Sequence, residues 1–102
     1  MKNKFYGMLG LCAKAGAAAS GAFAAEKAIK EGRAFLVIVS NDASESTKTS
    51  YEKMCNGYKV CLKFYGTKAE LGKAIGKDER TIIAITNEGL SENLQKMIVL
   101  EE

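Results

Sequence analysis

The chain has 102 residues, 47% of them hydrophobic and 26% charged, which suits one soluble domain with an ordinary core and excludes two domains. No apolar run approaches the ~20 residues of a membrane-spanning helix, and the basic start lacks the apolar block of a signal peptide, so we expect a cytoplasmic protein that does not enter membranes. The net charge is +3 and histidine is absent, which removes the commonest general base and the commonest metal ligand.

The first half of the chain alternates helical and strand patterns. Helical spacing predicts a helix near residues 3–14, stopped by Gly16, with an apolar stripe of Phe5, Met8, Leu9 and Cys12. Residues 17–20 are small and predict a brief edge strand. A second helix is expected from Gly21 to Glu31, with an inner face of Ala25, Ala28 and Ile29. Residues 34–39, AFLVIV, are continuously apolar and predict a central strand buried on both faces.

The second half repeats this alternation. We predict a helix over about 45–56, ended by Asn56-Gly57, and then a strand over 59–64. The next helix is opened by a capping box of Thr67 and Glu70 and closed by Gly76. A strand over 81–85 and a last helix with the stripe Leu90, Leu94, Met97 and Ile98 complete the chain. Alternating helices and strands predict an α/β fold, a three-layer α/β/α sandwich around a mainly four-stranded mixed sheet. We expect a single domain over residues 1–102.

Motifs for enzyme chemistry are absent. The segment GTKAELGKA resembles a phosphate-binding loop, but five residues lie between Gly66 and Gly72 where that motif has four, and Ala74 stands where a magnesium-binding Ser or Thr is needed. The three cysteines form no C-x-x-C pair and have no histidine partner, so reduced core thiols are expected. We therefore expect no enzyme activity, no cofactor and no small-molecule substrate.

Basic charge gathers in the N-terminal third. Residues 1–33 carry six basic and two acidic groups, a net charge of +4, whereas residues 34–102 carry nine basic and ten acidic groups, a net charge of −1. Such a sector suits a polyanion such as RNA, and a solvated helix face is the alternative. Two glycine-bearing turns are candidate contacts. One is Ser20-Gly21, which precedes Lys27, Lys30 and Arg33, and the other is the segment TNEG at residues 86–89.

Four segments together resemble a known family. They are GLCAKAG, SG…EKAIKEGRAFLVIVSNDAS, GTKAELGKAIGK and IIAITNEG, which occur in family order over about residues 5–98. The chain is similar to the kink-turn RNA-binding ribosomal protein family of the L-seven-Ae type, in its small bacterial YlxQ-like branch. The resemblance implies the sandwich fold, a structured and ribosomal RNA as partner, and RNA contacts at the start of the second helix and in the loop after the last strand.

The implied contacts carry over residue by residue. Gly21 and Lys27 match the family's glycine and lysine at the second helix, and the loop after the last strand corresponds to Ile85, Thr86 and Asn87, which would hold an extruded nucleotide. We expect these two turns to meet at one end of the sandwich. The cations expected to neutralise phosphates are Lys14, Lys27, Lys30 and Arg33.

One departure affects the base-reading site. Phe23 and Ala24 stand where the family has an Asn-Glu pair that reads sheared G·A pairs. Glu26 does not replace the acid, because it lies about 200° further round the helix. Phe23 either packs inward beside the sheet or lies exposed and stacks on an unpaired base. The sequence therefore leaves open an RNA-binding protein with an altered target and a protein-interaction module that has lost kink-turn recognition.

Overall fold

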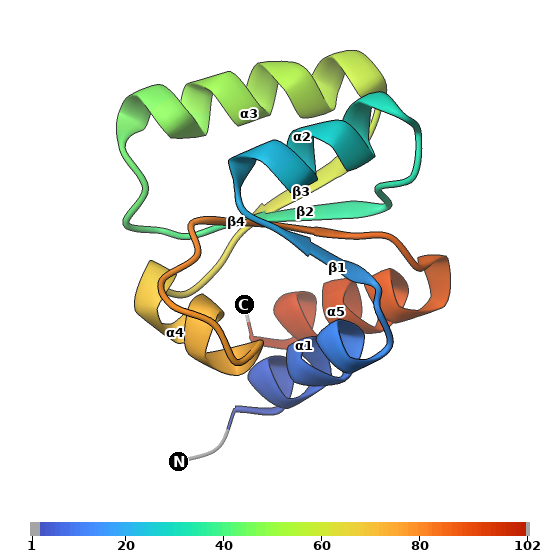
Figure 1. The fold of residues 1–102 in the computed structure, drawn as a ribbon, viewed down its shortest axis with the longest axis vertical. Coiled ribbons are helices and arrows are strands. Elements are labelled where there is room, and N and C mark those ends of the chain that lie inside the picture. The colour runs from blue at the N-terminus through green and yellow to red at the C-terminus, as the bar shows by residue number, and fades with distance from the viewer. Residues whose placement is uncertain (1–2, 102) are drawn as a thin grey trace.

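The computed structural model describes residues 3–101 and follows the predicted order of elements. Its helices and strands are α1 (Lys4–Lys14), β1 (Ala18–Ser20), α2 (Ala22–Lys30), β2 (Leu36–Val39), α3 (Glu45–Tyr58), β3 (Cys61–Phe64), α4 (Lys68–Ala74), β4 (Ile82–Ile85) and α5 (Glu88–Glu101). Figure 1 shows α2 and α3 on one face of the sheet and α1, α4 and α5 on the other. The predicted three-layer α/β/α sandwich is confirmed.

The four strands form one mixed sheet in the order β1-β4-β2-β3. Strand β4 runs antiparallel to both β1 and β2, whereas β2 and β3 are parallel. Every residue of β2 and β4 is buried, because helices cover both faces of these central strands. Their unbroken apolar sequence is what such two-sided burial requires.

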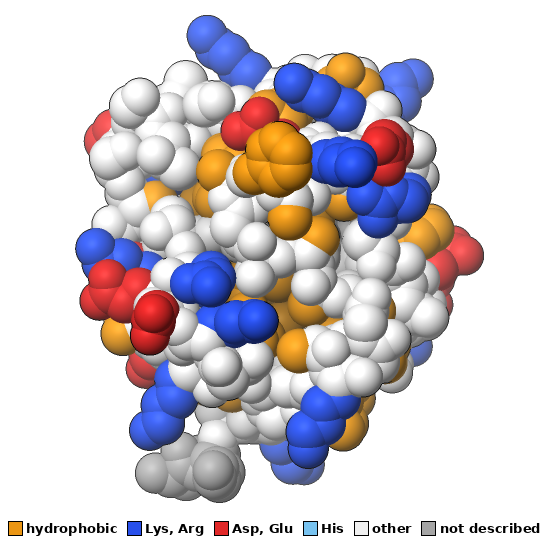
Figure 2. All heavy atoms as spheres, in the orientation of Figure 1, with side chains coloured by type: hydrophobic (Ala, Val, Ile, Leu, Met, Phe, Trp, Pro, Cys, Tyr) orange, Lys and Arg blue, Asp and Glu red, His pale blue; other side chains and the backbone are white. Residues whose placement is uncertain are grey.

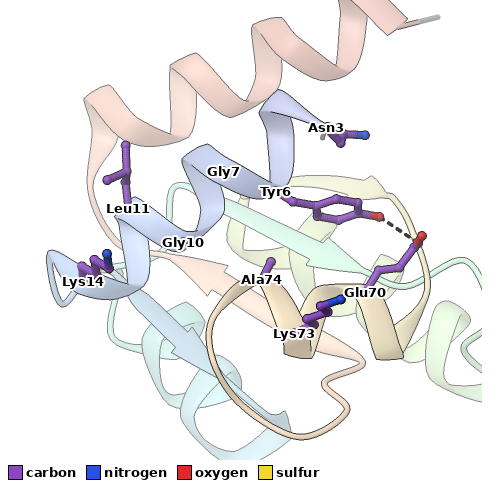
Figure 3. A pocket seen from close by; sticks show the side chains of 9 residues that line it. All are labelled: Asn3, Tyr6, Gly7, Gly10, Leu11, Lys14, Glu70, Lys73 and Ala74. Carbon is purple, nitrogen blue, oxygen red and sulfur yellow. Dashed lines mark hydrogen bonds between the residues drawn. The ribbon is translucent and has the colours of Figure 1, made fainter. Parts of the chain in front are cut away.

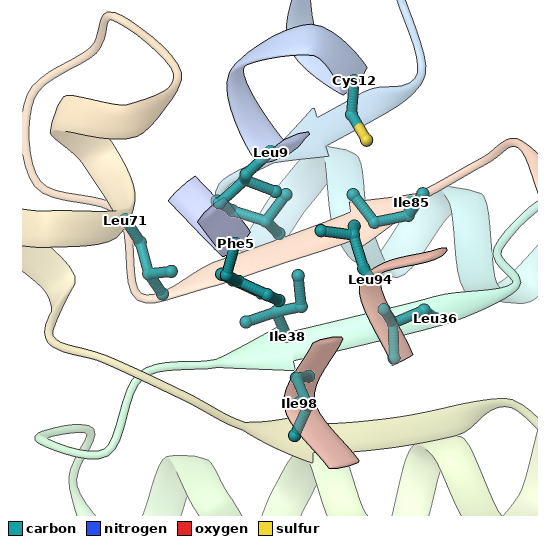
Figure 4. Packing of buried hydrophobic residues seen from close by; sticks show 10 residues of the cluster. Phe5, Leu9, Cys12, Leu36, Ile38, Leu71, Ile85, Leu94 and Ile98 are labelled. Atoms are coloured by element: carbon teal, nitrogen blue, oxygen red, sulfur yellow. The ribbon is translucent and has the colours of Figure 1, made fainter. Parts of the chain in front are cut away.

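Each face of the sheet has its own core. Under the sheet, Phe5, Leu9 and Cys12 of α1 pack against β2, β4 and α5, as Figure 4 shows. Above it, the alanine-rich face of α2 contacts the strands, and the members of this cluster include Ala25, Ala28, Ile29, Tyr51 and Cys55. Small side chains on α2 let that helix lie close to the sheet. None of the helices within residues 3–101 is long and apolar enough to cross a bilayer.

The end of α3 differs from the prediction. The helix does not stop at Asn56-Gly57 but continues to Tyr58, and Lys59 takes the left-handed conformation with φ 59°. The N–H of Val60 donates a hydrogen bond to the carbonyl of Cys55 (2.8 Å), which closes the helix end. Val60 also packs against the upper core. Tertiary packing of Val60 therefore outweighs the preference for glycine at this turn.

Candidate nucleic-acid interface

The outer face of α2 carries an exposed aromatic side chain in line with two lysines. Phe23 is 84% exposed, so the outward of its two predicted orientations is the one observed. Lys27 and Lys30 follow at spacings of four and three residues, which places all three side chains on one face of the helix. In Figure 2 a hydrophobic side chain protrudes over α2, with several Lys or Arg side chains and two acidic patches around it. An exposed ring among cations is a surface suited to nucleic acid.

The start of α2 depends on the backbone of Gly21. This residue has φ 91° and ψ 159°, a conformation that residues with a Cβ rarely adopt. Its N–H donates to the carbonyl of Ile82 (2.9 Å), which joins the turn to β4. No side chain caps the first turn of α2. The helix therefore begins with a first turn that receives no side-chain hydrogen bond.

Glu26 and Glu31, the acidic side chains in and just after α2, both have partners within the protein. Tyr51 of α3 donates a hydrogen bond from its hydroxyl to Glu26 (3.2 Å), which draws that carboxylate toward α3. Burial raises the pKa of Tyr51, and the nearby Glu26 carboxylate raises it further, so the hydroxyl stays protonated as a donor. Beyond the helix, Arg33 pairs with Glu31 (2.9 Å), and both side chains are about half exposed. Such surface pairs are weak, so Arg33 remains available to an anion.

A hollow of about 660 Å³ lies beside Gly21, between the starts of α2 and α3 and the connection that leads into β4. Most of its lining side chains are polar, with hydroxyl groups from Ser20, Ser46, Thr47, Ser50, Tyr51 and Thr81. Its charged side chains are Arg80 and the carboxylates of Glu26 and Glu79. Arg80 donates to the carbonyl of Glu79 (2.9 Å) and to the Ser20 hydroxyl (3.4 Å). The hollow can therefore form hydrogen bonds with a polar group placed beside the first turn of α2.

Sequence reasoning missed Arg80 and the connection that carries it. A Cβ at Gly72 in α4 would lie 2.0 Å from the carbonyl oxygen of Asp78, so only glycine lets this segment pack against α4. The N–H of Arg80 donates to the carbonyl of Lys68 (3.0 Å), which fixes the segment further. The available signal was Gly72 itself, because a glycine inside a short helical pattern often marks close backbone packing.

The expectation that the two glycine-bearing turns meet is wrong. In the β1–β4 pair, Ser20 lies opposite Ile83 while Ala18 lies opposite Ile85, so Gly21 follows one end of the ladder and residues 86–89 follow the other. Figure 1 shows these turns at opposite ends of β4. The antiparallel pairing of β1 with β4 is the reason, since the end of one strand lies beside the start of the other.

The residues predicted in the loop after β4 have structural roles. Ile85 is fully buried and its side chain points into the lower core in Figure 4, so in this structure it has no exposed surface to offer a nucleotide. Thr86 is partly buried, and its N–H donates to the carbonyl of Ala17 (2.9 Å). Asn87 accepts a hydrogen bond from the N–H of Leu90 (2.9 Å) and caps the start of α5.

The remaining predicted site residues divide into two groups. Gly21, Phe23, Lys27, Lys30 and Arg33 follow the course of α2 on one layer of the sandwich. Lys14 ends α1 on the other layer and does not join them. Among residues 3–101, no three His, Cys, Asp or Glu side chains gather in a way that could hold a metal ion.

Two curated proteins are similar to this chain over nearly its whole length. The chain is 35% identical over 95 residues to the RNA-binding protein YlxQ of Bacillus subtilis, covering 93% of this chain and 95% of that protein. It is 30% identical to the RNA-binding protein YlxQ of Enterococcus faecium over 98 residues, which is 95% of this chain and 93% of that protein.

Solved structures are similar over nearly the whole chain. A protein of unknown function from Bacillus halodurans superposes with a TM-score of 0.91 and 36% identity, covering 95% of this chain and 98% of the other. The 15.5 kD RNA binding protein of Giardia lamblia shares the fold, with a TM-score of 0.77 and 22% identity over 96% of this chain and 88% of its own. A sequence profile matches residues 3–95, and the chain belongs to the Ribosomal protein L7Ae/L30e/S12e/Gadd45 family.

Proposed function

We propose that this protein is a non-enzymatic RNA-binding protein that holds structured RNA along the outer face of α2. The observation that carries the proposal is Phe23, which is 84% exposed on the same helix face as Lys27 and Lys30. Covering an exposed ring removes apolar surface from water, which favours binding. An unpaired base is a flat partner that can cover it by stacking. The names of the two YlxQ relatives support RNA as the ligand.

The cations of α2 supply the sequence-independent part of binding. Lys27, Lys30 and Arg33 are all exposed, and the nearby Glu26 is turned toward Tyr51. Three phosphate contacts correspond to a slope of log affinity against log salt of about −2 to −3. The hollow beside the first turn of α2 would receive the base of an extruded nucleotide, which could bond to its hydroxyl groups. The phosphates would stay on the lysine face of α2, because the carboxylates of Glu26 and Glu79 also line the hollow.

Standard kink-turns are expected to be poor ligands of this surface. The Asn-Glu pair that the family uses to read G·A pairs is replaced by Phe23 and Ala24, and each bidentate base contact contributes roughly 1–3 kcal/mol of discrimination. Losing both lowers kink-turn affinity by about two to four powers of ten. Stacking on Phe23 replaces this reading, and we propose a kinked ribosomal RNA in the cytoplasm as the target.

Binding to structured RNA tests the proposal. Affinity for a kink-turn RNA, a ribosomal RNA fragment and a plain duplex would be measured by fluorescence anisotropy at several salt concentrations. Phe23→Ala should weaken binding by about 5- to 150-fold, the effect of losing one stacked base. Lys27→Ala should make the salt slope shallower by about 1. Phe23→Asn with Ala24→Glu should restore affinity for the kink-turn alone.

Matched variants on α3 serve as controls. Tyr58→Ala removes another exposed aromatic ring, and Lys53→Ala removes another exposed cation, so both should leave RNA affinity unchanged. Equal losses in Phe23→Ala and Tyr58→Ala would refute a stacking role for Phe23. Absence of binding to every RNA at low salt would refute the RNA function and favour a protein-interaction module.

A further inference from the structure

A second concave surface lies on the opposite layer of the sandwich, between α1 and α4. The groove has a volume of about 650 Å³. Figure 3 shows Tyr6 reaching from α1 toward Glu70 of α4 at one end, with Lys14 at the other. Its lining combines small residues of both helices with the side chains of Leu11, Lys14 and Lys73. None of them belongs to the α2 surface, so the groove is separate from the proposed RNA site.

The floor of the groove is made of small residues. A Cβ at Gly10 would lie 2.9 Å from the carbonyl oxygen of Ala74, so glycine there lets α1 and α4 pack closely. Gly7 has a different surrounding, since nothing lies within 4 Å of a Cβ built on it. One turn further along α1, Leu11 is 54% exposed although it is a large apolar residue. Packing against α4 accounts for Gly10 but leaves Gly7 and Leu11 without a partner among the described residues.

The groove carries more positive than negative charge. Lys14 and Lys73 are both exposed and line it. The single carboxylate, Glu70, accepts hydrogen bonds from the Tyr6 hydroxyl (2.9 Å) and from the N–H of Thr67 (3.1 Å), so partners within the protein occupy it. The rim therefore offers two cations that form no ion pair among residues 3–101, beside an apolar floor, which is complementary to an acidic, amphipathic ligand.

We propose that this groove docks an amphipathic helix of a partner protein, with the helix's apolar stripe on the glycine floor and its acidic residues facing Lys14 and Lys73. Small residues let helix axes approach to about 8–10 Å, and a third helix would cover Leu11 and fill the space over Gly7. An RNA ligand fits less well, because the ring in the lining, Tyr6, is only partly exposed and its hydroxyl donates to Glu70. Since α1 and α4 lie across the sheet from α2, the protein can hold RNA and this partner at the same time.

A displayed library of 16-residue helical peptides, sorted against the full chain, tests the proposal. Enriched peptides should carry apolar residues at helical spacing flanked by Asp or Glu. Synthetic versions should perturb amide signals of α1 and α4 in NMR spectra. Peptide affinity should fall at least about tenfold in Gly7→Met, which fills the groove, and in the double variant Lys14→Glu with Lys73→Glu. A peptide with Lys in place of its acidic residues should bind the double variant with the affinity that was lost.

Controls separate the groove from general effects on the surface. Gly57→Met on α3 introduces the same side chain at another helical glycine with open space above it, and Lys53→Glu with Lys96→Glu reverses the same number of charges elsewhere. Both should leave peptide binding unchanged. The proposal is overturned if no peptide binds with a Kd below about 1 mM, or if the enriched peptides carry no Asp or Glu beside their apolar residues. It is also overturned if Gly7→Met binds the peptides as well as the wild type does, or if structured RNA perturbs the amide signals of α1 and α4 instead.

Discussion

Substitution of Gly72 by Ala tests how the connection between α4 and β4 is held beside Gly21. A Cβ at position 72 would lie 2.0 Å from the carbonyl oxygen of Asp78 and 3.0 Å from the Cα of Glu79. Both neighbours are backbone, so no side-chain rotation can relieve the contact. Asp78 would have to withdraw by more than about 1 Å to reach ordinary van der Waals distance. This shift would strain the hydrogen bond from the N–H of Lys77 to the carbonyl of Gly72 (2.9 Å).

The expected change in stability combines two opposing effects. Alanine is more favourable than glycine inside a helix by about 1 kcal/mol. Overpacking a closed site costs about 1–3 kcal/mol, and here the contact is with backbone, which puts the cost at the upper end. We therefore expect Gly72→Ala to lower the free energy of unfolding by about 1–2 kcal/mol. Because the displaced segment carries Arg80 to the hollow beside Gly21, RNA affinity should fall as well.

Gly7→Ala is the matched control, since Gly7 also lies in a helix but nothing lies within 4 Å of its Cβ position. The free energy of unfolding of that variant should rise by about 0.5–1 kcal/mol from helix propensity alone. Urea unfolding followed by circular dichroism would measure both, and the two midpoints should differ by about 1 M or more. If Gly72→Ala is as stable as Gly7→Ala, the connection is not held against α4 as described.

Two further predictions concern titratable groups. The hydrogen bond from the Tyr6 hydroxyl lowers the pKa of Glu70 below its ordinary 4.5. The contact therefore stabilises the fold above pH 4.5, and this stabilisation is lost as the pH falls through the lowered pKa. Urea unfolding between about pH 2 and 6 should show a smaller loss of stability toward acid for Glu70→Gln than for the wild type. An unchanged pH dependence would contradict this. Burial raises the pKa of Cys12 and raises that of Cys55 to about 11, whereas Cys61 is only partly buried. A disulfide reagent should modify Cys61 first in the native protein, and rapid reaction of all three thiols would argue against the two buried environments.

The α2 surface was largely readable from the sequence. Helical spacing placed Ala25, Ala28 and Ile29 on the inner face, and all three are buried. The same spacing puts Phe23 on the opposite side of the helix, so its exposure could have been predicted from the inner face alone. Local periodicity was sufficient here because an isolated helix packed on a sheet has one buried side.

The partner of the Gly21 turn was not readable in this way. Both turns beside β4 contain residues suited to a loop, and nothing in their composition says which one lies next to Gly21. The antiparallel register of β1 and β4, with Ala18 opposite Ile85, brings the connection with Arg80 to Gly21 and takes Asn87 to the far end. Strand pairing joins residues more than 60 positions apart, and no local pattern encodes that distance.

The sequence by itself determined the order of helices and strands, the buried central strand over residues 34–39 and the cationic face of α2, because each depends on a pattern within a short stretch of chain. Only the tertiary structure decided that Ile85 is core, that Arg80 lies beside Gly21, and that α1 and α4 form a groove. These depend on which backbones come close enough to exclude a side chain, as they do at Gly72 and Gly10, and that closeness exists only once the three layers have assembled.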